Sequence, residues 1–252
     1  EVGGHFGGSA DGVCRGLKEA PLTPHVLEFK TINKKGFDKL CKDGVEKNQP
    51  KHYAQMQVYM KGLNLKRALY LSVCKDDDRI YMERVHYSAK AAKALINKAE
   101  HVITAGLPTD CMKISERLDW YECKWCDFKG ICHEDKIPEV NCRTCLHATP
   151  EIDGNGRWSC SFYKDNITED VQRTGCKKHL FIPGFIPGEM IDASKKDNSV
   201  TYRLKDGKEI INCSAPGDNH YTSKELHAMN LKMANDPVAT DIRNAFQARF
   251  VS

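Results

Sequence analysis

Cysteines crowd the middle of this 252-residue chain and limit its folds more than any other feature of the sequence. Eight of the twelve cysteines lie between Cys111 and Cys176, and two C-x2-C pairs occur among them. A C-x2-C turn lets two thiolates reach one metal ion. A disulfide-bonded secreted protein is the alternative, but the spacing and the absence of a visible signal peptide favour metal sites in a reducing cytoplasm.

The first cysteine group is Cys123-x2-Cys126-x5-Cys132. Three thiolates at this spacing suit an iron–sulfur cluster and a zinc ion equally well, because both are held by soft sulfur ligands. A zinc ion here would take Cys111 or His133 as its fourth ligand. We therefore predict a metal at this group and leave its identity open.

A second group of four thiols follows: Cys142, Cys145, Cys160 and Cys176. One C-x2-C turn and two later thiolates fit a four-coordinate structural zinc ion. The segment between them is polar, so a metal would supply folding free energy that an apolar core does not. Inert buried thiols are the alternative. His147 and His179 are spare candidates, and the choice between Cys176 and His179 as the fourth ligand stays open.

Hydrophobic periodicity predicts strands mixed with helices up to Gly106. We expect an extended segment at 1–16, strands at 26–32, 67–74 and 79–86, and helices at 37–43, 50–63 and 89–105. Ser88 is the expected N-cap of the last helix, and Gly106 ends it. This order of elements favours an α/β sheet with helical cover.

The composition changes after Gly106, where the cysteine groups begin and periodicity fades. The proline- and glycine-containing stretch 182–188 is expected to be a linker. A hairpin is predicted over 200–213, and helices are predicted to start at Thr222 or Ser223 and at Asp236-Pro237. The expected domains are 1–137, a core ending in the first cysteine group; 138–182, a zinc module; and 183–252, a small α+β tail.

A carboxylate and a lysine lie near the end of the strand predicted at 26–32. Glu28 and Lys30 are two apart on a strand and so leave the same face, while Leu27 and Phe29 are expected to point into the core. A hairpin would bring Asp11 beside Glu28. Two carboxylates from adjacent strands can hold Mg²⁺, which activates water, and a lysine can steady the charge on a phosphate. An exposed surface ion pair is the alternative.

Three ordered motifs resemble those of the RecB-like branch of the PD-(D/E)XK nucleases, including its phage-type members. The family's G-x-x-D, E-x-K and Q-x3-Y correspond here to Gly8 to Asp11, Glu28-Phe29-Lys30, and Gln55 to Tyr59. The resemblance implies a restriction-endonuclease-like core over roughly 1–135. It also implies that Asp11 and Glu28 bind Mg²⁺ or Mn²⁺ with the backbone carbonyl of Phe29, and that Lys30 is catalytic.

The resemblance further implies that Gln55 and Tyr59, four apart on one helix face, meet the DNA backbone and support the active-site lysine. A polar shoulder beside the helix's apolar stripe is the alternative. Lys34 and Lys35 belong to a lysine-rich stretch that flanks the same strand and helix, where phosphate contacts would matter. The net charge of +4 is too small to indicate nucleic-acid binding by itself.

Family members such as AddB and the CRISPR adaptation nucleases carry C-x2-C-x5-C at the place of the first cysteine group. There an upstream cysteine completes a [4Fe–4S] cluster, and a helix precedes the G-x-x-D strand. Neither is found before Gly8 in this chain, so we expect sequence to precede Glu1.

The expected function is therefore a Mg²⁺- or Mn²⁺-dependent DNA exonuclease, a phosphodiesterase of phage or bacterial recombination, replication or repair. A catalytically inactive DNA- or protein-binding module on a nuclease fold is the alternative. DNA is the expected partner, with other recombination or replication proteins beside it. No apolar run approaches the roughly 18 residues of a membrane helix, so no membrane partner is expected.

Overall fold

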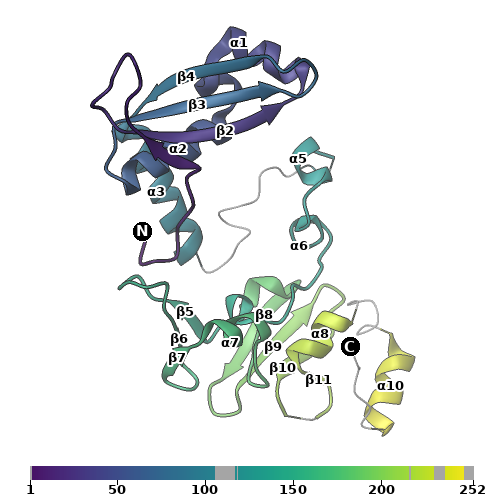
Figure 1. Ribbon diagram of the computed structural model, residues 1–252. Coiled ribbons are helices and arrows are strands. Elements are labelled where there is room, and N and C mark those ends of the chain that lie inside the picture. Colours follow the sequence, from purple (N-terminus) through teal and green to yellow (C-terminus); the bar gives the residue numbers. More distant parts are fainter. Residues whose placement is uncertain (1, 106–116, 118, 216, 230–235, 247–252) are drawn as a thin grey trace. The chain divides into compact units, whose positions relative to one another are not determined.

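A computed structural model describes residues 2–105, 117, 119–215, 217–229 and 236–246. The chain divides into two compact units, Glu1–His101 and Val102–Ser252 (Figure 1). Each unit has its own sheet and its own buried core. Among the described residues, no helix is both long and apolar enough to cross a membrane.

The first unit is a four-stranded mixed sheet with helices between its strands. Its elements are β1 (Gly12–Cys14), β2 (His25–Ile32), α1 (Lys34–Asn48), α2 (Pro50–Gly62), β3 (Arg67–Cys74), β4 (Ile80–His86) and α3 (Ala89–Thr104). The strand order is β1-β2-β3-β4, in which β2 and β3 are parallel and the other pairs antiparallel. The expected order of strands and helices, and the mixed α/β class, are confirmed.

The helix predicted at 37–43 is longer than the sequence pattern indicated. It begins three residues earlier, because the Asn33 side chain accepts a hydrogen bond from the N–H of Gly36 and caps the first turn. It continues through a kink at Gly44, whose φ of 75° is available to glycine at little cost. The Glu83 carboxylate accepts the N–H of Val45 just beyond this kink and holds the resumed turn.

The crossover helices bury the opposite face of β2 from the one that was expected. A connection between parallel strands passes over one face of the sheet, and here α1 and α2 make that passage between β2 and β3 (Figure 1). Val26 and Glu28 on this face are fully buried, whereas Phe29 is 47% exposed. The expectation that Leu27 and Phe29 point into the core is therefore wrong.

The core of the first unit lies between α1, α2 and the covered sheet face. Alternate residues of β3 are buried, as a strand with one covered face requires. The fully buried side chains of this core include Leu40 of α1, Met56 and Met60 of α2, and Tyr70 of β3. These side chains fix where α2 lies against β2, and so where its polar residues point.

The second unit combines short elements with one regular sheet. Its first half holds α5 (Tyr121–Lys124), α6 (Lys129–His133), η1 (Cys142–Thr144), β5 (Ala148–Pro150), β6 (Trp158–Cys160), β7 (Asp165–Ile167) and α7 (Glu169–Thr174). Its second half holds η2 (Pro183–Phe185), β8 (Gly188–Ser194), β9 (Ser199–Leu204), β10 (Glu209–Cys213), β11 (His220–Tyr221), α8 (Ser223–Ala228) and α10 (Pro237–Phe246). The sheets run β5-β6-β7 and β11-β10-β9-β8.

The stretch 182–188, expected to be a linker, is part of the second unit's core. Phe185 and Ile186 are 6% and 2% exposed and pack in one cluster with Phe181, Tyr202 and Ile210. Proline and glycine did indicate irregular backbone, but the apolar side chains beside them decide where that backbone lies. The segment lies inside the compact unit Val102–Ser252, and its apolar side chains belong to the buried cluster of that unit.

Two local predictions in this unit are confirmed. The hairpin around Asp206-Gly207 forms between β9 and β10. The helix start at Thr222 is a capping box, in which the Thr222 hydroxyl accepts the N–H of Glu225 and the Glu225 carboxylate accepts the N–H of Thr222.

Candidate functional site

The Glu28 carboxylate lies fully buried on the covered face of β2. Lys30, two residues further on the same strand, forms an ion pair with its Oε1, and the Lys30 side chain is 26% exposed. Apart from this ammonium, neither carboxylate oxygen of Glu28 has a hydrogen-bond partner among the described residues. A buried carboxylate with so few partners is costly unless a cation compensates its charge.

Asp11 reaches the same strand from the end of the preceding one. Its Oδ2 accepts a hydrogen bond of 2.6 Å from the backbone N–H of Phe29, the residue between Glu28 and Lys30. The antiparallel register pairs Gly12 with Leu27, so one further step sets Asp11 opposite Glu28. The three acidic and basic residues predicted for the site are therefore brought together at one place on the sheet.

Two side chains behind this place were missed by the sequence analysis. Tyr70 pairs with Glu28 in the β2–β3 register, and its hydroxyl lies 2.9 Å from Nδ1 of His52 on α2. Burial, with the Glu28 charge adding to it, raises the pKa of Tyr70 to about 12. Burial and then the Lys30 charge lower the pKa of His52. The available signal was spacing, since His52 precedes Gln55 by three residues on one helix.

The Q-x3-Y pair is joined by a hydrogen bond. Gln55 Nε2 donates to the Tyr59 hydroxyl over 2.9 Å. The Tyr59 ring lies against the backbone of Gly8, where a Cβ would come within 2.8 Å of the ring's Cε1. The first and third motifs are thus in direct contact, and Gly8 leaves the space in which the Tyr59 ring sits.

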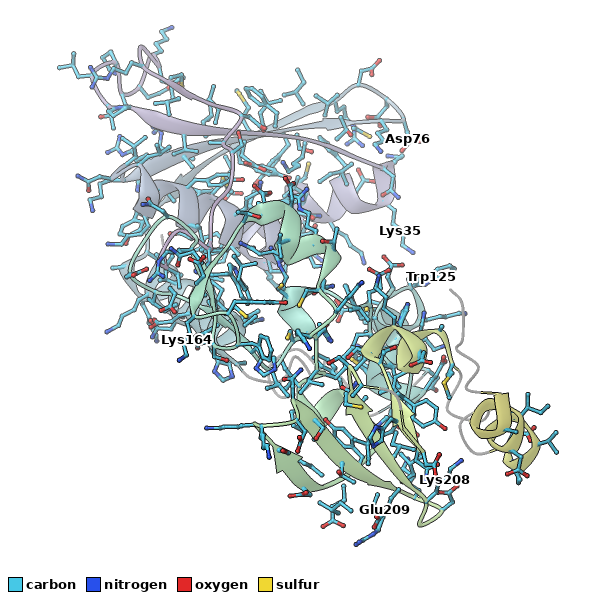
Figure 2. All side chains as sticks on the ribbon, turned by 90° about the horizontal axis from the view of Figure 1, so that it is seen from below. Lys35, Asp76, Trp125, Lys164, Lys208 and Glu209 are labelled. Atoms are coloured by element: carbon cyan, nitrogen blue, oxygen red, sulfur yellow. The ribbon has the colours of Figure 1, made fainter. Side chains whose placement is uncertain are left out.

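The two lysines predicted to contact DNA differ in their surroundings. The Lys34 ammonium lies 3.2 Å from Oδ2 of Asp38 and 3.9 Å from Oδ2 of Asp77, so acidic neighbours compensate its charge. Lys35 is exposed at the start of α1 (Figure 2). Of the two, Lys35 is the more available to a phosphate.

The first cysteine group lies on two short helices and the turn between them. Cys123 is buried in α5, Cys126 follows it in the turn, and Cys132 lies in α6. His133, one candidate for a fourth ligand, has an Nε2 with no hydrogen-bond partner among the described residues. Cys111, the other candidate, lies outside the described residues.

The second cysteine group lines a cavity of about 360 Å³, together with His147 and His179. Its members are the four thiols expected at a zinc ion, namely Cys142, Cys145, Cys160 and Cys176. The eleven described cysteines form no disulfide with one another. Burial, followed by the charges of the three neighbouring thiols, raises the pKa of Cys142 to about 11.

The thiols of the second cysteine group line one cavity, but their positions do not match those of ligands around a bound metal ion. Within the described ranges, no three cysteine, histidine, aspartate or glutamate side chains already have the spacing of a metal site. Asp11 and Glu28 are two carboxylates, so they do not make up a set of three such side chains by themselves. Both places bring together side chains of the types that bind metals.

No protein-family model matches the chain, and no curated protein matches it. The chain is similar to a crystal structure of SSO0001, at 22% identity and a TM-score of 0.31, over 49% of this chain and 48% of that one. The match thus spans about half the length of SSO0001, and at this TM-score it supports neither a fold assignment nor a function.

Proposed function

We propose that the chain is a metal-dependent DNA nuclease with a RecB-like PD-(D/E)XK site, acting as an exonuclease in DNA recombination, replication or repair. One observation carries the proposal: Asp11, Glu28 and Lys30 meet on neighbouring strands, with Asp11 bound to the peptide between the other two. In this proposal Asp11 and Glu28, with the Phe29 carbonyl, would hold Mg²⁺ or Mn²⁺. When bound, the ion would activate a water and stabilise charge on the phosphate.

The burial of Glu28 supports a role beyond a surface ion pair. A surface pair gains little, and both of its partners are hydrated. Glu28 is fully buried and has only the Lys30 ammonium as a partner among the described residues. Such a carboxylate retains lone pairs for a divalent cation, and the ammonium lies where it can orient a water or a phosphate oxygen.

The α2 residues support the same reading of the site. Gln55 and Tyr59 bond to each other, and Tyr59 contacts Gly8 three residues before Asp11. We assign this pair to DNA positioning, because neither side chain contacts Glu28 or Lys30 in a hydrogen bond or ion pair that the described residues make. Lys35 would add a phosphate contact from the start of α1.

The experiment is cleavage of end-labelled single- and double-stranded DNA by the full chain, with Mg²⁺, with Mn²⁺ and with chelator. Asp11→Ala, Glu28→Gln and Lys30→Met should each lower cleavage by about 100-fold or more. Glu209→Gln, which removes an exposed carboxylate of the second unit, is the matched control and should cut normally.

Near-normal cleavage by Asp11→Ala or Glu28→Gln would overturn the assignment of the site. A wild-type chain that binds DNA but never cuts it, with either metal, would refute the nuclease and favour the non-enzymatic binding module instead.

A further inference from the structure

Residues 146–178 form a long segment without any buried side chain. They contribute the three-residue strands β5, β6 and β7 and the single helix α7. Neither apolar cluster of the protein includes a residue from this segment. Backbone ordering costs about 1–2 kcal/mol per residue, so a segment of this kind needs a stabilising contact other than a hydrophobic core.

The four thiols of the second cysteine group lie at the ends and turns of this segment. Cys142 begins η1 and Cys145 directly follows it, Cys160 ends β6, and Cys176 follows α7. All four line the same cavity. A single ion bound there would therefore join the start, middle and end of a segment that its own packing does not hold.

The turn that carries Cys142 and Cys145 is held in shape by its neighbours. The Asn141 side chain accepts the N–H of Arg143, and Thr144 donates its hydroxyl to the Glu139 carbonyl over 2.8 Å.

His179 braces this turn against the core of the second unit. Its Nε2 lies 3.0 Å from the Asn141 carbonyl, which can only accept, so Nε2 carries the proton. Its ring packs edge-on against the buried Phe181, with ring centroids 4.9 Å apart. Its Nδ1 has no hydrogen-bond partner among the described residues, which leaves a buried lone pair beside the cavity.

We propose that Cys142, Cys145, Cys160 and Cys176 bind one structural zinc ion, and that His179 is a positioning residue that orients the Cys142–Cys145 turn. Four thiolates satisfy the tetrahedral preference of zinc, and the hydrogen bond from Nε2 of His179 to the carbonyl of Asn141 holds the residue that precedes Cys142. As each Zn–S bond forms, one thiol releases its proton to solvent, so four protons leave for one ion bound.

Zinc binding must also draw the thiols inward. The cavity of about 360 Å³ is larger than one ion needs, and no three suitable side chains of the described residues yet have ligation spacing. Metal binding and folding of 146–178 are therefore coupled, so that the binding free energy is part of the stability of this segment. The inference does not depend on the proposed nuclease activity.

The first experiment is elemental analysis of the full chain purified without added metal. Because the first cysteine group can also bind zinc, the readout is a difference between variants. Cys142→Ser with Cys145→Ser should lower the zinc content by one equivalent per chain, whereas Cys41→Ser, which removes an exposed thiol on α1, should leave it unchanged. Equal zinc content in the double variant and the wild type would overturn the proposal.

The second experiment separates Cys176 from His179 by replacing zinc with Co²⁺, whose visible absorption reports the ligand set. Cys176→Ser should change the sulfur-to-cobalt bands, and His179→Ala should keep the four-sulfur spectrum with weaker metal affinity. The reverse result would overturn the ligand set in favour of three cysteines and a histidine. Hydrogen exchange should lose protection across 142–180 after chelation, and zinc-free protein with full protection there would refute the structural role.

Discussion

The Tyr59 ring occupies the space that a side chain at Gly8 would need. A Cβ at Gly8 would lie 2.8 Å from Cε1 and 3.2 Å from the hydroxyl oxygen of Tyr59. Carbon atoms do not approach this closely without displacement. The backbone of Gly8 is outside the left-handed region, so the need for glycine there comes from this contact.

Gly8→Ala should therefore destabilise the protein by about 1–3 kcal/mol, the usual cost of overpacking. The added methyl should displace the Tyr59 ring and weaken the bond from Gln55 Nε2. Thermal denaturation measures the loss. Gly7→Ala is the matched control, because a Cβ at Gly7 meets nothing within 4 Å.

A double-mutant cycle tests whether the Tyr59 ring is the cause. If it is, Gly8→Ala should cost much less in a Tyr59→Leu background, with a coupling energy above about 0.5 kcal/mol. Additive losses in the double variant would mean that Gly8 is required for another reason.

Lys30→Met should destabilise the metal-free protein, because it leaves the buried Glu28 carboxylate without a compensating charge. The loss should be near or below the roughly 3–5 kcal/mol of a fully buried broken pair, since Lys30 is partly exposed. Mg²⁺ should then raise the melting temperature of Lys30→Met more than that of the wild type. Lys34→Met, which breaks an exposed pair, should lose less than about 1 kcal/mol.

If neither Mg²⁺ nor Mn²⁺ changes the melting temperature of Lys30→Met, the result would contradict metal binding by Glu28. This measurement does not use cleavage, so it tests the metal site apart from the reaction.

His52 should titrate below the ordinary histidine value of 6.5, as followed by NMR of its ring protons, because burial and the Lys30 charge both lower its pKa. The folded state thus favours neutral His52. Its contribution to stability is present above about pH 6.5 and is lost as the pH falls through the lowered pKa. Lys30→Met should raise the pKa of His52, and no change would mean that the two side chains do not lie near each other.

Short-range features of the first unit were predictable from the sequence. The strand predicted at 67–74 and the amphipathic helix predicted at 89–105 form as β3 and α3, with bounds that agree to within one residue. The pairing of Asp11 with the Glu28 strand followed from a hairpin register. The face of β2 that the helices cover could not be predicted in this way. Leu27 and Phe29 are as apolar as core residues, and only the path of α1 and α2 decides which face is covered.

Features set by distant packing were not predictable. Tyr70 and His52 meet because a parallel strand returns beside β2, and nothing in either local sequence shows this. The stretch 182–188 has linker-like composition, yet Phe185 and Ile186 are buried by strands further along the chain. The cysteine spacing predicted four thiols around one place, and they line one cavity, while the bracing by Asn141 and Phe181 carried no sequence signal.

Tyr59→Phe should weaken the binding of DNA without altering the binding of metal. The substitution keeps the ring against Gly8 but removes the hydroxyl that accepts from Gln55 Nε2. Loss of one such hydrogen bond is worth about 0.5–1.5 kcal/mol, so KM for DNA should rise by roughly 2- to 12-fold at about 1.4 kcal/mol per tenfold. Mn²⁺ affinity, followed by thermal shift, should stay at the wild-type value. Tyr53→Phe is the matched control, since Tyr53 lies on the same helix but its hydroxyl is near Glu46 and Ser88 rather than Gln55. If Tyr59→Phe and Gln55→Ala both cut at the native rate at low DNA concentration, this helix face is structural, and DNA must be positioned elsewhere in the site.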